Sequence, residues 1–416
     1  MEQAVFTPGN ILIPKKNVDM KKWSVVACDQ FSSEPAYWER VREAVGDLPS
    51  TFHLILPEAW LEGADLSREG DRIGGAMARC LEAEVFEEIP DSYIFVERRL
   101  AGGKVRRGLV GCLDLEAYDF APGTNAPVRA SENTVVSRLP ARIEMRRRGA
   151  LETPHVMLLM DDPGKTVFAP LSKGAKRLRL LYDFDLMEGG GHITGRQVTG
   201  AEAKALSRAL SGQTLLVGDG NHSLAAAKLY WSEVKAGLGP EERAVHPARY
   251  ALAELTNVHD DSLEIEPIHR IVRGGTGGLV RAFIQGCPNA SAEVLPAGSG
   301  PTARRIRYID GAETGDIYVT GLTIGETIGA LQAFLDGQAD LDIDYIHGRE
   351  SLERLARQPG SVGFLMPPVE KAELFRSTQT DVFPKKSFSM GHAADKRYYL
   401  ECRAIRETGG RRGGNI

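Results

Sequence analysis

The chain has 416 residues, of which 42% are hydrophobic and 26% charged; this is ordinary for a soluble globular protein and long enough for roughly two or three domains. The formal net charge of −5 argues against a general nucleic-acid binder, which normally carries a basic excess. The five cysteines are scattered singly, which predicts reduced thiols and no zinc site.

The N-terminus has no basic segment followed by an apolar core, so no signal peptide is expected. No apolar run approaches the ~18 residues that are needed to span a bilayer. These features predict a soluble, cytoplasmic protein without a membrane partner. They leave the oligomeric state open.

Short apolar runs that are typical of strands alternate along the chain with stretches of helical spacing. The predicted strands are residues 23–28, 51–56, 92–100, 106–115, 155–160, 214–218, 249–258, 304–309, 316–322, 361–366 and 397–405. The predicted helices are residues 35–45, 70–88, 140–149, 200–211, 222–236 and 349–357, and residues 121–130 are a predicted loop. This mixture predicts an α+β fold with mixed sheets and flanking helices.

Two glycine-rich segments, RGGTGG (273–278) and PAGSGPTA (296–303), flank a less patterned region. They predict an N-terminal α+β region over residues 1–272 and a smaller α/β insertion over residues 273–340. A C-terminal segment, residues 341–406, is expected to pack back on the core. Residues 407–416 have almost nothing to bury and are a predicted disordered tail.

The stretch Gly218-Asp219-Gly220-Asn221-His222-Ser223 lies between a predicted strand and a predicted helix. Its glycines permit unusual backbone conformations, and a helix start exposes N–H groups that suit an anion. Asp219 would repel a bare phosphate, but it would suit a divalent cation or the proton of an attacking hydroxyl. On spacing alone, capping of the helix by Asp219 or Asn221 is favoured over a ligand site, and both interpretations stay open.

A basic helix is predicted to begin at about Pro140. Arg142 and Arg146 are four residues apart and share a face, with Arg138 leading into it. Guanidinium groups on one face can bind phosphate or carboxylate. The alternative is a solvated helix in which Glu144 pairs with Arg148.

Acidic residues also follow two other predicted strands. Asp29 follows the first of these, and Asp161 and Asp162 end the second. Paired acids can bind a metal, but a turn or a helix cap is the favoured interpretation of both positions. Cys28 is favoured as a core residue over a nucleophile, because no basic partner lies nearby in the sequence.

Two basic pairs occur in the second half of the chain, His269-Arg270 and Lys385-Lys386. One such pair alone would be ordinary surface chemistry. Several pairs embedded among glycine, proline and aromatic residues predict a single pocket for an anionic ligand.

Ordered motifs along nearly the whole chain resemble a bacterial family known as domain of unknown function 1015. The motifs are WSVVACDQF, EPAYW, SENTVVSRLPARIEMRRRGALETPHVMLLMDDP, VGDGNHSLAAAK, EIEPIHRIV, DYIHG, VGFLMPP and FPKKSFSMGHAADKRYYLE. The resemblance implies the family but no activity.

The DGNHS stretch is also similar, more distantly, to the ParB/sulfiredoxin-like superfamily, in which a turn of this kind binds nucleotide phosphates. An archaeal free serine kinase of that superfamily uses an Asp-Gly-His turn in phosphoryl transfer. The resemblance implies a nucleotide-binding core in the N-terminal region. It also implies that Asp219 and His222 are catalytic, with Asp219 a possible Mg²⁺ ligand. The candidate nucleotide- or phosphate-binding residues are Gly218, Gly220, Asn221, Ser223, Glu132, Thr134, Arg138, Arg142, Arg146, His269, Arg270, Lys385 and Lys386.

The turn departs from the broader family pattern, which tends to have His-His-Arg where this chain has Asn221-His222-Ser223. The arginine expected to clamp phosphate is absent at Ser223, so a guanidinium would have to come from Arg138, Arg142 or Arg270. The Walker pattern GxxxxGK[ST] does not occur, so the chain is not a P-loop protein.

These features lead to the expectation of a phosphotransferase or nucleotide hydrolase that uses Mg²⁺ and a nucleoside di- or triphosphate, with a small polar metabolite as substrate. The alternative is a nucleotide or metabolite sensor without turnover. DNA binding, as in ParB partition proteins, is disfavoured by the acidic net charge and by the lack of an evident helix-turn-helix segment.

Overall fold

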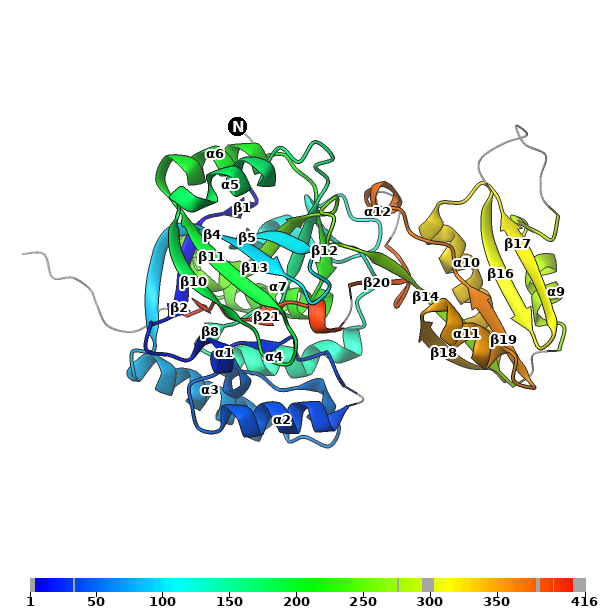
Figure 1. Ribbon diagram of the computed structural model, residues 1–416, viewed down its shortest axis with the longest axis horizontal. Helices are drawn as coiled ribbons and strands as arrows, with labels where there is room; N and C mark the ends of the chain where they lie inside the picture. Colours follow the sequence, from blue (N-terminus) through cyan, green and yellow to red (C-terminus); the bar gives the residue numbers. More distant parts are fainter. Residues whose placement is uncertain are drawn as a thin grey trace, which may run out of the picture.

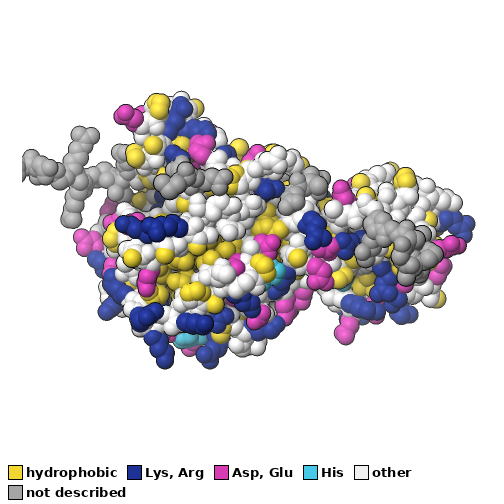
Figure 2. Space-filling model, turned by 90° about the horizontal axis from the view of Figure 1, so that it is seen from above, with side chains coloured by type: hydrophobic (Ala, Val, Ile, Leu, Met, Phe, Trp, Pro, Cys, Tyr) yellow, Lys and Arg dark blue, Asp and Glu magenta, His cyan; other side chains and the backbone are white. Residues whose placement is uncertain are grey.

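The computed structural model describes residues 4–32, 34–274, 277–293, 303–378, 382–391 and 393–406. The chain forms a large lobe around an 11-stranded sheet and a smaller lobe around a 7-stranded sheet, which lie side by side in Figure 1. Seen from above, a waist separates the two lobes (Figure 2). The predicted α+β fold with mixed sheets and flanking helices is confirmed.

The large sheet has the order β10-β11-β4-β5-β13-β9-β12-β7-β6, with β1 beside β5 and β2 beside β4. Most of its pairs are antiparallel, whereas β13–β9, β12–β7 and β6–β7 are parallel. Its strands are β1 (Phe6–Thr7), β2 (Gly9–Pro14), β4 (Phe86–Arg99), β5 (Val105–Asp114), β6 (Tyr118–Asp119), β7 (Val128–Ala130), β9 (Met157–Met160), β10 (Arg179–Asp185), β11 (His192–Val198), β12 (Leu215–Asp219) and β13 (Tyr250–Asn257).

The small sheet has the order β15-β17-β16-β19-β14-β18, and β20 pairs with β14. Its strands are β14 (Ile265–Arg273), β15 (Ala290–Ser291), β16 (Arg304–Asp310), β17 (Glu313–Val319), β18 (Asp342–His347), β19 (Ser361–Leu365) and β20 (Phe388–Met390). Two further pairs lie on the large lobe: β21 (Tyr398–Tyr399) with β3 (Val25–Val26), and β22 (Arg403–Ala404) with β8 (Leu151–Glu152).

Helices cover both faces of the large sheet, with α2 and α3 on one side and α5 and α6 on the other (Figure 1). The helices of the large lobe are α1 (Met20–Trp23), α2 (Pro35–Val45), α3 (Leu66–Glu82), α4 (Leu139–Arg148), α5 (Phe168–Gly174), α6 (Gly200–Leu210), α7 (Asn221–Lys235) and α8 (Pro240–Val245). Those that follow β14 are α9 (Leu279–Gly286), α10 (Ile324–Asp336), α11 (Arg349–Ala356) and α12 (Lys371–Ser377).

Helix α3 shows why these sequences form helices that pack on the sheet. Asp65 caps its start, because its carboxylate accepts hydrogen bonds from the N–H groups of Ser67 and Arg68. Ile73, Ala76 and Met77 recur at helical spacing and are buried, so one stripe of the helix faces the core. The same apolar cluster includes Trp23, Trp38 and strand residues of the large sheet.

The apolar core of the small lobe continues into the large sheet. Met157, Leu159 and Leu216 of β9 and β12 pack in the same buried cluster as Phe283 and Leu331 of the small lobe. The strand that ends at the GDGNHS turn therefore lies where the two lobes meet.

The segment expected to return to the core, residues 341–406, is divided between the lobes. β18 and β19 belong to the small sheet, and β21 and β22 lie on the large lobe. The predicted boundary at residue 272 falls at the end of β14. The domain division stays a prediction, and the predicted tail, residues 407–416, lies outside the described residues, as does most of the PAGSGPTA segment.

Two local predictions are wrong. Residues 51–56, a predicted strand, begin with the 3₁₀ helix η1 (Thr51–Leu54), because Ser50 caps it and the Thr51 hydroxyl donates to the Trp23 carbonyl. The predicted loop over residues 121–130 ends in β7, which pairs in parallel with β12. In the described part of the chain, no helix has the length and apolar character that a bilayer crossing requires.

Candidate functional site

The turn between β12 and α7 is shaped by its two glycines. Gly218 lies at a register shift between β12 and β9, and a Cβ there would come within 2.8 Å of Leu159 Cγ. Gly220 has φ +79°, and a Cβ there would lie 3.0 Å from the Val156 Cα. Both positions therefore require glycine, Gly218 for close packing and Gly220 for its left-handed backbone as well.

The first turn of α7 has no side-chain cap. Gly220 is its N-cap residue, and the Asp219 carboxylate accepts from the Gly220 N–H at 3.0 Å instead of from the helix. Capping by Asp219 or Asn221, which spacing alone favoured, is therefore wrong. An uncapped helix start presents N–H groups and a partial positive charge, and both suit an anion.

Asp219 faces a lysine from the C-terminal segment. Its Oδ2 atom lies 3.4 Å from Lys396 Nζ, and the two side chains are 13% and 11% exposed. That oxygen and Asn221 Oδ1 are buried without a hydrogen-bond partner in the structure. Such oxygens suit a hard cation, but the described residues hold no group of three His, Cys, Asp or Glu that could bind a metal by themselves.

The imidazole of His222 is held as an acceptor. The Val135 N–H donates to His222 Nε2 at 3.1 Å, which leaves the ring proton on Nδ1. Burial, followed by the charges of Arg142 and Arg138, lowers the pKa of His222 to about 4. The ring is therefore neutral near pH 7, and its Nδ1 can donate a hydrogen bond but carries no charge.

A second acidic position lies beside this turn. Asp29 Oδ2 is 3.8 Å from His155 Nε2, and a 2.8 Å hydrogen bond joins His155 Nδ1 to the Tyr399 hydroxyl. Burial raises the pKa of Asp29, but His155, the Gln30 amide and Lys396 outweigh it, so the net pKa lies below its ordinary value. Asp29 is therefore ionised near neutral pH, and its charge is also felt by His222.

The surroundings of the Cys28 thiol disfavour the thiolate form. Burial, aided by the charge of Asp29, raises its pKa to about 12. The sequence-based interpretation of Cys28 as a core residue fits this environment.

Glu132 links the turn region to the segment that leads to β20. Its Oε1 accepts from the N–H groups of Ser387 and Phe388 at 3.1 and 3.4 Å. Burial raises the pKa of Glu132 to about 7, against the lowering effects of these two bonds, Lys396 and Arg270. Lys396 thus influences three carboxylates: Asp219, Asp29 and Glu132.

The three arginines of the basic segment have different environments. Arg138 is exposed, yet close enough to His222 to lower the pKa of that ring. Arg142 pairs with Glu58. Arg146 donates to Glu152 of β8 at 2.7 Å, so its guanidinium is engaged away from the turn. The predicted pairing on the same helix also exists, because Arg148 Nε lies 2.7 Å from Glu144.

The basic pairs of the second half divide in the same way. His269 Nδ1 accepts from the Met366 N–H at 3.1 Å, and Arg270 donates to Gln332 at 2.9 Å, so both side chains are engaged within the small lobe. Burial lowers the pKa of Lys386, and the charge of Arg138 lowers it further. The two cations are therefore near each other. Lys385 lines a separate cavity at the start of α10.

Two remaining predictions can also be placed. Thr134 has a buried hydroxyl without a hydrogen-bond partner, one residue before the Val135 N–H that binds His222. Asp162 accepts from the Val167 N–H at 3.0 Å, and Asp161 lies 2.7 Å from His259, so the favoured turn interpretation describes this pair.

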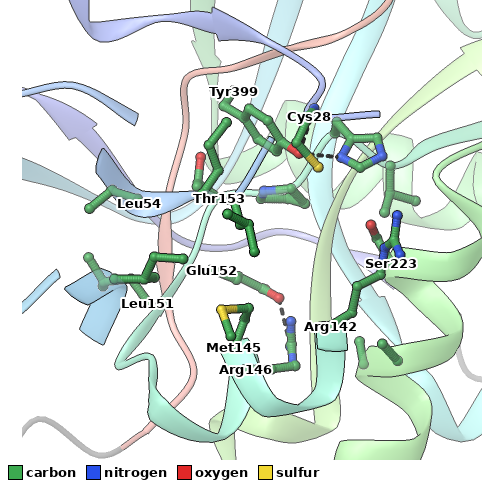
Figure 3. Close-up of a pocket in the computed structure, with 18 of the residues that line it drawn as sticks. Cys28, Leu54, Arg142, Met145, Arg146, Leu151, Glu152, Thr153, Ser223 and Tyr399 are labelled. Atoms are coloured by element: carbon green, nitrogen blue, oxygen red, sulfur yellow. Dashed lines mark hydrogen bonds and ion pairs between the residues drawn. The ribbon is translucent and has the colours of Figure 1, made fainter. Parts of the chain in front are cut away.

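A cavity of about 170 Å³ lies between α4 and α7 and adjoins the turn that joins β12 to α7. Figure 3 shows Cys28 and Tyr399 at one end, Arg142 and Ser223 along one side, and Leu54 on the opposite side. Because Ser223 belongs to the first turn of α7, the cavity opens beside the uncapped helix start.

Sequence reasoning did not place Asp29, His155, Lys396 and Tyr399 beside the turn. Asp29 does follow a strand, as Asp219 does, and this was the available signal. Lys396 and Tyr399 come from the C-terminal segment, and β21 brings them to the site by pairing with β3, which ends two residues before Cys28.

Comparisons with known proteins match the chain to one family. The family described as "Protein of unknown function (DUF1015)" matches residues 12–404. No curated protein matches the chain.

Several solved structures are similar in outline. SbnI with a C-terminal truncation from Staphylococcus aureus is 11% identical and covers 68% of this chain and 82% of its own, with a TM-score of 0.38. A free serine kinase variant in complex with ADP is 12% identical and covers 73% of this chain and 93% of its own, with a TM-score of 0.40. A conserved hypothetical protein from Pyrococcus furiosus is 10% identical and covers 71% and 94%, with a TM-score of 0.36.

Likeness at this level assigns no reaction and no residue role to the chain. The family match, in contrast, extends over nearly all of the sequence. The chain therefore belongs to the DUF1015 family of proteins of unknown function.

Proposed function

We propose that the protein is a nucleotide-dependent phosphotransferase, which moves a phosphoryl group from a nucleoside triphosphate to the hydroxyl of a small acceptor. One observation carries the proposal: the start of α7 is uncapped and lies beside Asp219, whose buried Oδ2 accepts no hydrogen bond but lies 3.4 Å from Lys396 Nζ. Phosphoryl transfer depends mainly on positioning and charge neutralisation, and these groups supply both.

In this proposal, the N–H groups at the start of α7 bind phosphate oxygens. Lys396 adds a positive charge, and His222 donates a neutral hydrogen bond from Nδ1. The guanidinium missing at Ser223 is supplied by the exposed Arg138, with Lys386 beside it. Arg142, which pairs with Glu58, is less available for this task.

A Mg²⁺ ion bound with the nucleotide fits the oxygens of Asp219 and Asn221, because Mg²⁺ usually takes one or two protein oxygens together with phosphates and water. When bound, it would neutralise charge on the transferring phosphate. Nothing else in the proposed step depends on it.

Asp29 is the proposed general base. The acceptor hydroxyl gives its proton to the Asp29 carboxylate as its oxygen forms a bond to the γ-phosphorus. The bond between that phosphorus and the bridging oxygen breaks, and the nucleoside diphosphate leaves with the electron pair. The Gln30 amide donates to Asp29 Oδ1 at 3.0 Å and orients the base, and His155, which is hydrogen-bonded to Tyr399, lies beside it.

The substitution Asp29→Asn tests the role of the base. Asn keeps the shape of the side chain but cannot take the proton, so phosphoryl transfer should fall by about 10²-fold or more, with ATP affinity within about twofold of wild type. Transfer is followed by ³¹P NMR with Mg²⁺-ATP and a panel of hydroxy acids and alcohols. Asp47→Asn, at an exposed position after α2, is the matched control and should behave like wild type.

Equal transfer by wild type and Asp29→Asn would overturn the assignment of the base. ATP binding without transfer to any acceptor would favour the second candidate, a nucleotide sensor. The position of the site where the two lobes meet would allow a sensor to change shape on binding. Absence of nucleotide binding would contradict both candidates.

A further inference from the structure

The cavity between α4 and α7, here named the acceptor cavity, has an interior that the phosphate-binding proposal does not use. Its apolar wall includes Leu54 of η1, Ile73 and Met77 of α3, Met145 of α4 and Leu151 of β8. These residues come from separate elements, so several parts of the large lobe build the cavity together, and it is not a groove along one helix.

The volume of the acceptor cavity indicates the size of its occupant. It measures about 170 Å³, and an apolar cavity of roughly 150 Å³ in another protein core binds benzene. An apolar group about as large as a phenyl ring fits the space.

The polar end of the acceptor cavity lies toward the proposed reaction centre. Tyr399 and His155 line this end, and His155 contacts Asp29, the proposed base. Ser223 lines it from the first turn of α7. A molecule whose apolar group fills the interior would therefore direct a hydroxyl toward the base and the phosphate-binding turn.

Arg142 and Glu58 form a polar part of the rim. The Arg142 guanidinium lines the acceptor cavity, and its partner Glu58 lies on the same rim. The pair is only partly buried, with side chains 16% and 17% exposed, and it leaves no net charge on this side of the rim. The rim is therefore polar but does not itself select a charged ligand.

We propose that the acceptor is a hydroxyl compound with an apolar group about the size of a phenyl ring, and that the acceptor cavity binds that group. This inference rests on the proposed function for the direction of transfer. The binding preference itself can be measured without any nucleotide.

The test compares 3-phenyllactate with lactate, which has the same hydroxyl and carboxylate but no ring. Binding is measured by ligand-observed NMR titration of the full chain without nucleotide. Wild type should bind 3-phenyllactate at least about tenfold more tightly than lactate, because only the former fills the apolar interior. Equal affinities, or absence of 3-phenyllactate binding, would overturn the inference.

Ala141→Leu fills the acceptor cavity from α4, where Ala141 is half-buried and lines the space. It should weaken 3-phenyllactate binding at least about tenfold and leave lactate binding unchanged. Ala205→Leu makes the same change on the exposed face of α6 and should alter neither affinity. Unchanged 3-phenyllactate binding by a folded Ala141→Leu variant would place the ligand elsewhere.

Met145→Ala provides a test in the opposite direction and does not depend on Ala141→Leu being folded. It enlarges the acceptor cavity, so the preference should shift toward 2-hydroxy-4-phenylbutyrate, which is one methylene longer. No shift would contradict the assignment of the cavity. An ATP titration of the same sample separates the two proposals: ATP binding without 3-phenyllactate binding contradicts only this inference, and the reverse result contradicts only the proposed function.

Discussion

Glu132 is a half-buried residue whose ionisation should be visible in the stability of the protein. Burial raises its pKa from 4.5 to about 7. Between these two values, the unfolded chain releases the proton before the folded chain does, so stability falls as the pH rises from 4.5 to 7 and is level above that range.

Glu132→Gln should remove this loss of stability. Gln keeps an oxygen that can accept from the Ser387 and Phe388 N–H groups but has no proton to release. The variant should therefore be more stable than wild type at pH 8. Its advantage in free energy of unfolding should be about 2 kcal/mol larger at pH 8 than at pH 4.5. Urea unfolding at the two pH values measures it, and exposed Glu241→Gln is the control. A gain that does not change with pH would contradict the raised pKa.

Arg138 and Arg146, which the sequence places in one group, should respond to substitution in opposite ways. Arg146→Met leaves Glu152 with Arg403 as its remaining cation, at 2.8 Å, so it should cost about 2 kcal/mol of stability and leave ATP affinity unchanged. Arg138→Met changes an exposed side chain, so it should weaken ATP binding severalfold and leave stability within about 0.5 kcal/mol.

Thermal unfolding and ATP titration of the two arginine variants check these outcomes. Weaker ATP binding by Arg146→Met, with no loss of stability, would return Arg146 to the phosphate site. If Arg138→Met binds ATP as tightly as wild type does, Arg138 is not the guanidinium that binds phosphate.

At the scale of elements, the turn between β12 and α7 depends on the backbone of Gly220. Gly220→Ala should destabilise the protein by about 2 kcal/mol or more, because φ is +79° and the new Cβ would lie 3.0 Å from Val156 Cα. Gly278→Ala is the matched control, since Gly278 is also an N-cap with φ +73° but has nothing within 4 Å of an added Cβ.

Gly278→Ala should lower the free energy of unfolding by about 1 kcal/mol, which is the cost of the left-handed conformation alone. Differential scanning calorimetry of both variants measures the difference. Equal losses at the two positions would show that the turn is not constrained by contact with Val156.

The helices that carry the site were predictable because their periodicity is clear. The predicted helices over residues 140–149 and 222–236 correspond to α4 (Leu139–Arg148) and α7 (Asn221–Lys235). The strand predicted over residues 51–56 fails because hydrogen bonds from Ser50 and Thr51 to the end of α1 set the local backbone, and apolar spacing contains no trace of them. β14 and β18, which join the small sheet, were missed altogether.

At the scale of the whole molecule, the candidate site could be predicted only in part. The GDGNHS turn is local in sequence, so its glycines, Asp219 and His222 could be identified from it. Asp29 and Lys396 come from opposite ends of the chain, and they meet because β21 pairs with β3. Spacing along the sequence carries no information about such a pairing, so these residues could not be assigned to the site in advance.

The site also depends on both lobes. β12 leads into the turn and shares a buried apolar cluster with the small lobe, while Glu132 holds the N–H groups of Ser387 and Phe388 beside β20. A phosphate bound at α7 would contact groups from distant parts of the chain. We therefore expect nucleotide binding to stabilise the molecule as a whole, which a shift in melting temperature would report.

The central claim is that the start of α7 and Lys396 bind nucleotide phosphates, and calorimetric titration with Mg²⁺-ATP tests it most directly. Wild type should bind ATP, Lys396→Met should bind it at least about tenfold more weakly because a charge-assisted contact is lost, and exposed Lys204→Met should match wild type. Absence of ATP binding by wild type, or equal affinity in wild type and a folded Lys396→Met variant, would contradict the account.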